Sequence, residues 1–260
     1  MSADPLSLAD WFESPLGRAL LAREQAVARL AFEHAFGSYL LQIGGWGPTD
    51  TFLPMARTQR HALVAEQDGE GDFVSHATQL AVAANSVDAL FLPHTLEFEP
   101  EPHAVLREAE RVLVGEGHLI VLGFAPFGAW GLRHRLSRDG FPPGLTQTWS
   151  HRRLSDALRV LGFEVETVHR YLGLWPSQRL QAGSLGTAVE RTGRWVGRLT
   201  SAIPGSRQQE PLAGAYLLAA RKRVYAPTRL VHIRRRAPRF TPSLARPTAS
   251  LSPSAPERCP

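Results

Sequence analysis

The sequence predicts a Rossmann-like α/β fold, in which helices cover both faces of a doubly wound, mostly parallel sheet. Between residues 37 and 223, short apolar runs of strand length alternate with segments of helical spacing. The first run ends on Gly44, Gly45 and Gly47, and acids or histidines follow several of the others. Parallel sheets are built from such continuous apolar strands, and their ligands bind beyond the carboxyl ends of the strands.

We expect residues 1–36 to form a helical cap that precedes the sheet domain. Ser14 is placed to cap a helix, with Pro15 in the first turn, where a missing N–H costs nothing. The helix either covers one face of the sheet or forms a lid over a cofactor; apolar stripes more often belong to the core. The apolar residues that recur at helical spacing are Leu16, Leu20, Val27, Leu30 and Ala31. The charged residues that fall largely between them are Arg18, Arg23, Glu24 and Arg29.

The apolar run Tyr39–Ile43 predicts the first strand, and the glycines after it predict a sharp turn. Glycine lets backbone N–H groups approach a ligand closely, because no Cβ intervenes. A tight turn without any ligand is an equally good interpretation. The next segment, Thr51–Gln59, predicts a helix, although Pro54 limits where it can begin.

A second apolar run, His61–Ala65, ends on Glu66, which lies twenty-two residues beyond Gly44. Nucleotide-binding α/β proteins place a carboxylate at about this distance to bind ribose hydroxyls. An ionised carboxylate only accepts hydrogen bonds, so it suits a diol with two O–H donors. The alternative is an exposed loop acid, because three more acids follow closely: Asp68, Glu70 and Asp72.

Three further strands are predicted, and polar residues follow two of them. His76, Ala77 and Thr78 come at the end of the third strand, and His94 comes at the end of the fourth. Because the carboxyl ends of parallel strands meet at one edge, we expect these groups to lie beside the glycine turn. The predicted strands span 73–75, 86–92 and 118–122, and a helix runs from 103 to a C-cap at Gly115.

Residues 123–150 are loop-rich, aromatic and partly basic. Loops held on a rigid sheet commonly carry substrate contacts. We therefore expect substrate-loop residues here, namely Trp130, Arg133, His134 and Trp149. A helix capped by Ser150 or Thr148, a strand over 163–170 and a last strand over 213–220 complete the domain.

The basic charge of the chain is concentrated in residues 224–260. This segment holds seven arginines and one acid, a net charge of +6, whereas the whole chain is +5 and the first 223 residues are therefore −1. That distribution argues against a basic nucleic-acid groove on the folded body. Seven prolines among 37 residues predict a disordered tail. Residues 229–239 either bind RNA or another polyanion weakly and nonspecifically, or form a solvated tail.

Cysteine and hydropathy patterns exclude several classes of protein. Cys259 is the only cysteine, so a disulfide within the chain is impossible and a reducing, cytoplasmic location is expected. The histidines form no His-x-x-x-His spacing, and no metal site is predicted. No apolar run approaches the roughly 20 residues that span a bilayer, and the N-terminus does not read as a secretory signal.

With the order of segments complete, the chain resembles class I S-adenosylmethionine-dependent methyltransferases. Asn85–Gly123 carries the most specific likeness, to the bacterial type 11 group typified by ubiquinone-pathway C-methyltransferases. It contains a strand, a loop, a helix that ends in Arg111-Val112-Leu113, a glycine turn and another strand. Residues 162–165 and 216–222 resemble the last two strands of that group. The resemblance implies a seven-stranded sheet whose last strand is antiparallel.

The resemblance also implies a cofactor, S-adenosylmethionine, and a methyl acceptor that we take to be a small molecule. His94 is the candidate catalytic base, because the loop after strand four faces the methyl group in this family; the alternative is a structural histidine bonded to a nearby backbone group. A nicotinamide dehydrogenase is a weaker alternative for the glycine turn. The expected cofactor-binding residues are Gln42, Gly44, Gly45, Gly47, Glu66, His76, Ala77, Thr78 and His94.

Three positions depart from the family pattern. Gln42 stands where the family has an acid, Trp46 where a glycine is expected, and His76 where an acid usually reads the adenine amino group. Two hypotheses therefore stay open. The chain is either an active methyltransferase or a relative whose cofactor site has eroded and which serves as an interaction or RNA-binding module.

Overall fold

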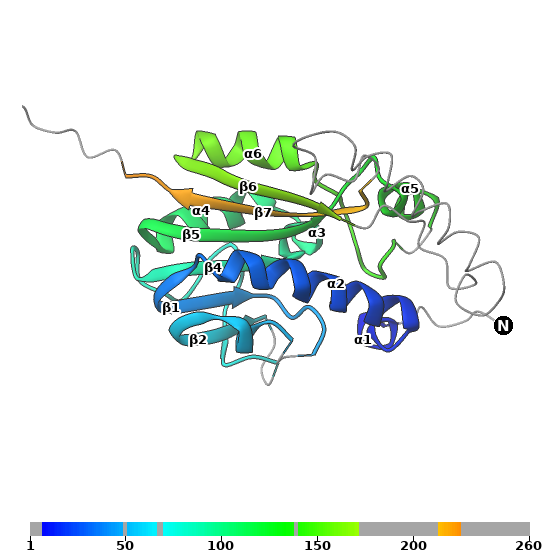
Figure 1. Ribbon diagram of the computed structural model, residues 1–260, viewed down its shortest axis with the longest axis horizontal. Helices are drawn as coiled ribbons and strands as arrows, with labels where there is room; N and C mark the ends of the chain where they lie inside the picture. Colours follow the sequence, from blue (N-terminus) through cyan, green and yellow to red (C-terminus); the bar gives the residue numbers. More distant parts are fainter. Residues whose placement is uncertain (1–6, 49–50, 67–69, 138–139, 172–212, 225–260) are drawn as a thin grey trace, which may run out of the picture. The chain divides into compact units, whose positions relative to one another are not determined.

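A computed structural model describes residues 7–48, 51–66, 70–137, 140–171 and 213–224, which lie in one compact unit. They form a seven-stranded sheet of order β3-β2-β1-β4-β5-β7-β6 (Figure 1). Every neighbouring pair is parallel except the two that involve β7, so the predicted topology is confirmed. The strands are β1 Phe36–Ile43, β2 Arg57–Ala65, β3 Phe73–Val74, β4 Val87–Pro93, β5 Leu113–Phe124, β6 Phe163–Tyr171 and β7 Ala215–Lys222.

Helices cover both faces of this sheet (Figure 1). On one face, α1 and α2 pack with aromatic residues from the 124–145 region; on the other lie α3, α4 and α6. The interpretation of the N-terminal helix as a cover for the sheet is confirmed, and Ser14 caps it by accepting a hydrogen bond from Gly17 N–H. The helices are α1 Leu8–Phe12, α2 Pro15–Phe32, α3 Thr95–Phe98, α4 Pro102–Val112, α5 Ala129–Leu136 and α6 His151–Val160.

Two predicted details of secondary structure are wrong. The helix expected over Thr51–Gln59 is a single 3₁₀ turn, η1 Leu53–Met55, and β2 already begins at Arg57. Phe52 and Leu53 insert into the core under α2, which already covers this face, so no second helix is needed there. Gly115 is not a helix cap, because α4 ends at Val112 and β5 follows at once. The predicted disordered tail lies outside the described residues, apart from Val224.

The register of the central strands places their carboxyl ends at one edge. Ile43 pairs with Val64 across β1 and β2, and Pro93 pairs with Leu122 across β4 and β5. The last residues of β1, β2 and β4 are buried, whereas the amino-terminal halves of β1 and β2 are largely exposed. The turns that follow β1, β2 and β4 therefore begin side by side on a rigid, buried frame.

Candidate cofactor site at the carboxyl ends of the strands

A cavity of about 290 Å³ opens where β1, β2, β3 and β4 end. Four of the predicted cofactor residues line it: Gly44, Gly45, Glu66 and Ala77. The other predicted residues, Gln42, Gly47, His76, Thr78 and His94, do not line the cavity. Its wall also contains Leu8, Ile43, Trp46, Val64, Ala65, Glu70, Ser75, Pro93, Thr95, Phe98, Glu99 and Pro100.

The three glycines of the turn have different roles. Gly44 (φ +86°) and Gly47 (φ +75°) adopt left-handed backbone conformations, and a Cβ on Gly47 would lie 2.9 Å from Leu21. A Cβ on Gly45 would instead meet no protein atom within 4 Å. Gly44 and Gly47 thus make the turn, while Gly45 leaves open space in the cavity wall, as a close-fitting ligand requires.

The side chain of Gln42 stabilises this glycine turn by a hydrogen bond. Its side chain is buried, and Nε2 donates to the carbonyl of Gly44 at 3.1 Å. The Oε1 atom has no hydrogen-bond partner among the described residues. Gln42 therefore supports the turn rather than reaching into the cavity.

The polar part of the cavity is acidic. Glu66, Glu70 and Glu99 line it, and no lysine, arginine or histidine is among the lining residues. His76 lies on the exposed rim, with Nδ1 3.6 Å from the Glu66 carboxylate. Partial burial and the adjacent Glu66 carboxylate raise the pKa of Glu99 to about 7, against a smaller opposing effect of His76. Such a lining favours cations and hydroxyl donors over phosphates.

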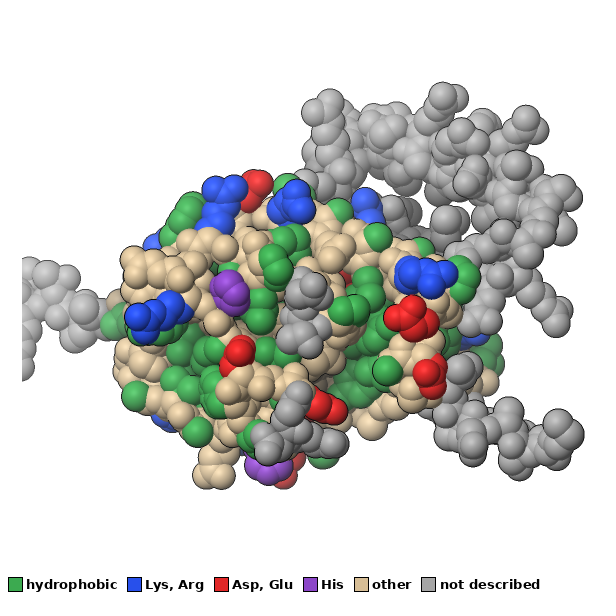
Figure 2. Space-filling view, turned by 90° about the horizontal axis from the view of Figure 1, so that it is seen from below, with side chains coloured by type: hydrophobic (Ala, Val, Ile, Leu, Met, Phe, Trp, Pro, Cys, Tyr) green, Lys and Arg blue, Asp and Glu red, His purple; other side chains and the backbone are tan. Residues whose placement is uncertain are grey.

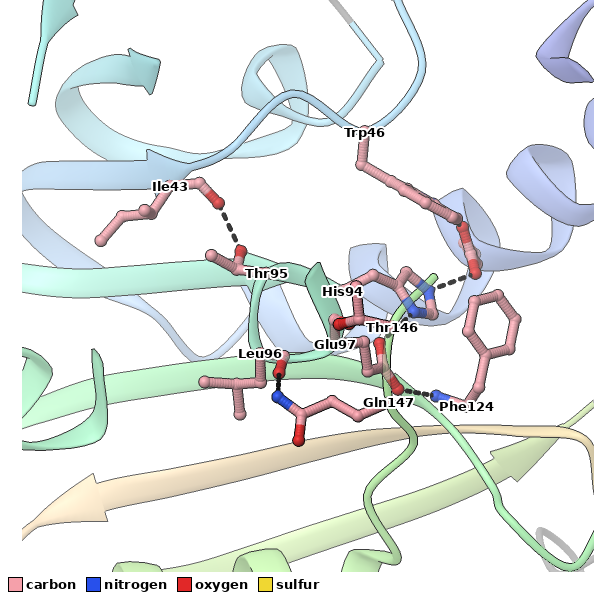
Figure 3. Close-up of polar contacts among 10 residues, drawn as sticks. Ile43, Trp46, His94, Thr95, Leu96, Glu97, Phe124, Thr146 and Gln147 are labelled. Carbon is pink, nitrogen blue, oxygen red and sulfur yellow. Dashed lines mark hydrogen bonds and ion pairs between the residues drawn. The ribbon is translucent and has the colours of Figure 1, made fainter. Parts of the chain in front are cut away.

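The loop after β4 is tied firmly to its surroundings (Figure 3). The Thr95 hydroxyl donates to the carbonyl of Ile43 at 2.5 Å, which joins this loop to the end of β1. Gln147 Nε2 donates to the carbonyls of Leu96 (3.3 Å) and Glu99 (2.6 Å). These bonds fix the backbone on which Phe98 and Glu99 face the cavity.

His94 is fully buried between two carboxylates (Figure 3). Its Nδ1 lies 2.8 Å from Glu97 and its Nε2 lies 2.8 Å from Glu24, which comes from α2. Trp46 Nε1 donates to the other oxygen of Glu24 at 2.6 Å, and the backbone N–H of Phe124 donates to Glu97. We call Glu24, His94 and Glu97 the buried ionic cluster.

The charge state of this cluster follows from its geometry. Burial alone would lower the pKa of His94, but Glu24 and Glu97 outweigh it and raise that pKa to about 9. Burial raises the pKa of Glu97, although His94 opposes this. At neutral pH the imidazole is therefore protonated, and both of its N–H groups are engaged. It has neither a free nitrogen nor an exposed atom with which to take a proton from a substrate.

The residues predicted for a substrate loop lie in two separate places. Trp130 is buried, with its ring stacked on Phe124 at 5.5 Å. Arg133 lies over the Phe141 ring at 4.0 Å, and His134 accepts the Phe141 N–H. Trp149 belongs to the core on the opposite face of the sheet, where Arg153 covers its ring. None of the four predicted residues lines the cavity.

Glu24, Glu97 and Glu99 were not among the predicted site residues. Glu24 lies four residues after Leu20 and four before Ala28, so it is on the buried stripe of α2. An acid at such a position is the feature of the sequence that could have identified Glu24 as a buried polar residue. The prediction that Glu24 falls between apolar positions is wrong, because its side chain is fully buried. Glu97 and Glu99 follow the predicted fourth strand closely in the sequence, and only the folded loop shows that one faces the core and the other the cavity.

Other kinds of site receive no support from the described residues. These residues contain no group of three or more histidine, cysteine or acidic side chains that could hold a metal ion. Nor does any helix among them have the length and apolar character to cross a membrane. On the face of the molecule shown in Figure 2, basic side chains are scattered among hydrophobic and acidic ones.

Comparisons with known proteins agree with this geometry. Residues 42–121 match the family described as a methyltransferase domain. The uncharacterized protein YafS of Escherichia coli is 28% identical over 162 residues, which are 62% of this chain and 67% of YafS. Mycobacterium tuberculosis has an uncharacterized protein that is 31% identical over 186 residues, and the match spans 61% of its length.

Solved structures share the fold at low identity. A putative methyltransferase of Haloferax volcanii, solved with its Trm112 activator, aligns with a TM-score of 0.56 at 15% identity, over 85% of this chain and all of the other. A geranyl diphosphate methyltransferase in complex with S-adenosylmethionine aligns at 0.52 and 17%, over 80% of this chain and 89% of the other. The chain thus has the Rossmann-like fold of class I methyltransferases, and its residues 42–121 match the model of a methyltransferase domain.

Proposed function

We propose that this chain binds S-adenosylmethionine in the cavity at the strand ends and transfers its methyl group to a small-molecule acceptor. The observation that carries the proposal is an acid-lined cavity above the glycine turn of a methyltransferase fold. Every lining residue except Leu8 lies within the matched domain. A sulfonium cation with a ribose diol suits three glutamates, whereas the pyrophosphate of a nicotinamide dinucleotide does not.

Bound S-adenosylmethionine would supply an electrophilic methyl group. The open side of Gly45 would let the ligand approach the backbone closely, and Glu66 would accept hydrogen bonds from the ribose hydroxyls. Trp46 and Phe98 form apolar walls that exclude water. Methyl transfer is an in-line displacement, so alignment of this kind contributes up to several kcal/mol.

In this proposal His94 is a positioning residue. A base is required only when the acceptor must lose a proton, and both nitrogens of His94 are already bonded to carboxylates. The buried ionic cluster holds Trp46 against α2 and fixes the loop after β4. The likeness of Asn85–Gly123 to the ubiquinone-pathway group supports a small organic acceptor.

A second candidate is a relative with an eroded cofactor site that serves in interactions. It is favoured by Gln42, which is turned to Gly44 instead of the cavity, and by Trp46, which fills space where the family has a glycine. Cofactor that co-purifies with the chain would count against this candidate.

Calorimetric titration of the full chain with S-adenosylmethionine and with S-adenosylhomocysteine tests the proposal. We expect binding below millimolar ligand, and Glu66→Gln should weaken it about tenfold, as loss of a charged hydrogen-bond acceptor does. Glu101→Gln is the control, since Glu101 is exposed and lies outside the cavity wall. No binding of either ligand at millimolar concentration would refute the proposal.

A further inference from the structure

Helix α5 and the turn before it leave large apolar side chains on the surface. Phe127 is 80% exposed, Leu132 48% and Leu136 72%. Of the nine large hydrophobic residues that are exposed in the described part of the chain, these three fall within one short segment. We call Phe127, Leu132 and Leu136 the α5 apolar patch. Single exposed apolar residues are normal on a protein surface, whereas a contiguous group of them marks an interaction site.

The packing of α5 turns its leucines outward. Trp130 and Gly131 are buried on the inner side of the helix, and the Trp130 ring stacks on Phe124 at 5.5 Å. Successive residues of an α-helix are about 100° apart, which places Leu132 and Leu136 about 40° from each other and roughly opposite the inner side. The two leucines therefore occupy the centre of the outer face, where a surface helix usually carries polar residues.

Close contacts hold α5 in this orientation. A Cβ on Gly128, which precedes the helix, would lie 2.7 Å from Gly214 Cα. On the same side, the Trp130 ring packs on Phe141 with a centroid distance of 5.3 Å. A rotation that buried the leucines would expose Trp130 and break these contacts. The outward position of the α5 apolar patch is thus built into the fold.

Arginines flank the leucines on the outer face. Arg135 lies about 60° from Leu132 around the helix axis, and Arg133 lies about 60° from Leu136 on the other side. The Arg135 guanidinium is 5.6 Å from the centre of the Phe127 ring, so this charge adjoins the apolar patch. Leucines at the centre of a face with arginines beside them match the boundary between the acyl chains and the headgroups of an anionic lipid layer.

The local charge and the place of α5 in the fold agree with such a partner. Residues 124–137 contain no acid that would repel an anionic surface. With eight residues, α5 has the length to lie in the interface but not to cross a bilayer. The helix follows the carboxyl end of β5, so it lies at the same edge of the sheet as the cavity (Figure 1).

We propose that α5 docks this protein onto an anionic lipid surface. Phe127, Leu132 and Leu136 enter the interface, and Arg135 meets the lipid phosphates. This inference goes beyond the proposed function and does not depend on it, because it concerns a surface outside the cavity wall.

Sedimentation of the full chain with vesicles tests the proposal. The vesicles consist of phosphatidylcholine with about one third phosphatidylglycerol, which supplies the negative charge. Replacing Leu132 and Leu136 together by Gln should weaken the partition onto these vesicles by about tenfold, because two apolar side chains no longer leave water. Arg135→Gln should weaken it by about fivefold at low salt, and this difference should shrink as salt is added.

Val160→Gln is the matched control, since Val160 is 87% exposed but belongs to α6. It should leave vesicle binding unchanged. Residues 224–260 add the same basic charge to every variant, so differences between variants report on α5. A wild-type chain that does not bind the vesicles, or equal binding by the wild type and the double leucine variant, would overturn the proposal. So would a dimer in analytical ultracentrifugation that the double variant dissociates, if vesicles are not bound; the patch would then belong to a contact with a second copy.

Discussion

His94 combines an unusual backbone conformation with complete burial. It lies at φ +58° immediately after β4, and its protonated ring joins α2 to the loop that carries Glu97. Its burial is tolerated because every N–H group of the ring meets a carboxylate. The cluster also satisfies Trp46 Nε1 and the backbone N–H of Phe124, so several elements depend on it.

Replacing His94 by Asn should lower the free energy of unfolding by about 3–5 kcal/mol, because two buried carboxylates lose their cation. Asn tolerates the left-handed backbone, so the effect reports on charge and not on strain. Urea denaturation measures the change. His61→Asn, at an exposed position of β2, should stay within about 0.5 kcal/mol. Equal losses in the two variants would contradict the buried ionic cluster.

The same residue makes stability depend on pH. The pKa of His94 is raised in the folded chain from 6.5 to about 9, so the folded state holds a proton that the unfolded state loses. Its stabilisation is complete below pH 6.5 and is lost as pH rises toward 9, by up to about 1.4 kcal/mol per unit. Urea midpoints measured across this range should fall in the wild type, and the fall should be much smaller in His94→Asn. Parallel curves would exclude His94 as the cause.

At the scale of elements, α1 and α2 meet so closely that a glycine is required. A Cβ on Gly17 would lie 2.7 Å from Phe12 Cα and would also collide with the carbonyl of Trp11. The aromatic residues of α1 thereby reach Trp46 and Trp130, with ring centroids 4.8 and 6.4 Å apart respectively. The contact fixes the angle at which the first two helices cover the sheet.

The substitution Gly17→Ala tests that contact, because its effect on stability should be opposite in sign to the usual effect of alanine in a helix. Alanine in a helix normally adds about 1 kcal/mol of stability relative to glycine. Here the clash with α1 should reverse this, and the melting temperature should fall. Ala22→Gly at an exposed position of α2 calibrates the propensity effect and should cost about 1 kcal/mol. A melting temperature that rises in Gly17→Ala would mean that the two helices are not packed in this way.

At the scale of the whole molecule, the last 37 residues carry a net charge opposite in sign to that of the rest of the chain. Residues 224–260 carry a net charge of +6, and the first 223 carry −1. If Arg229–Arg239 bind polyanions, the full chain should elute from heparin at higher salt than a chain ending at Arg223. Changing Arg234, Arg235 and Arg236 to Gln should remove most of the difference. Identical elution of the full and shortened chains would rule out binding by this segment.

The topology could be predicted because buried parallel strands are short apolar runs whose ends align. The cavity could be located for the same reason, as Gly44 and Glu66 show. Side-chain direction could not be read from the order of residues. Trp130 and Trp149 looked equivalent yet belong to opposite faces of the sheet, and His94 ended a strand but points into the core. Contacts between distant segments, such as Glu24 with His94, require the folded chain.

The hydrogen bond between Glu24 and Trp46 has a practical consequence for the design of truncated or chimeric forms of this chain. A fragment that starts at residue 37 would keep Trp46 and His94 but discard the oxygen atoms that both require. A chimera that takes its first two helices from a relative must likewise bring an acid at position 24. The first two helices are thus an integral part of the folded domain, not a detachable extension.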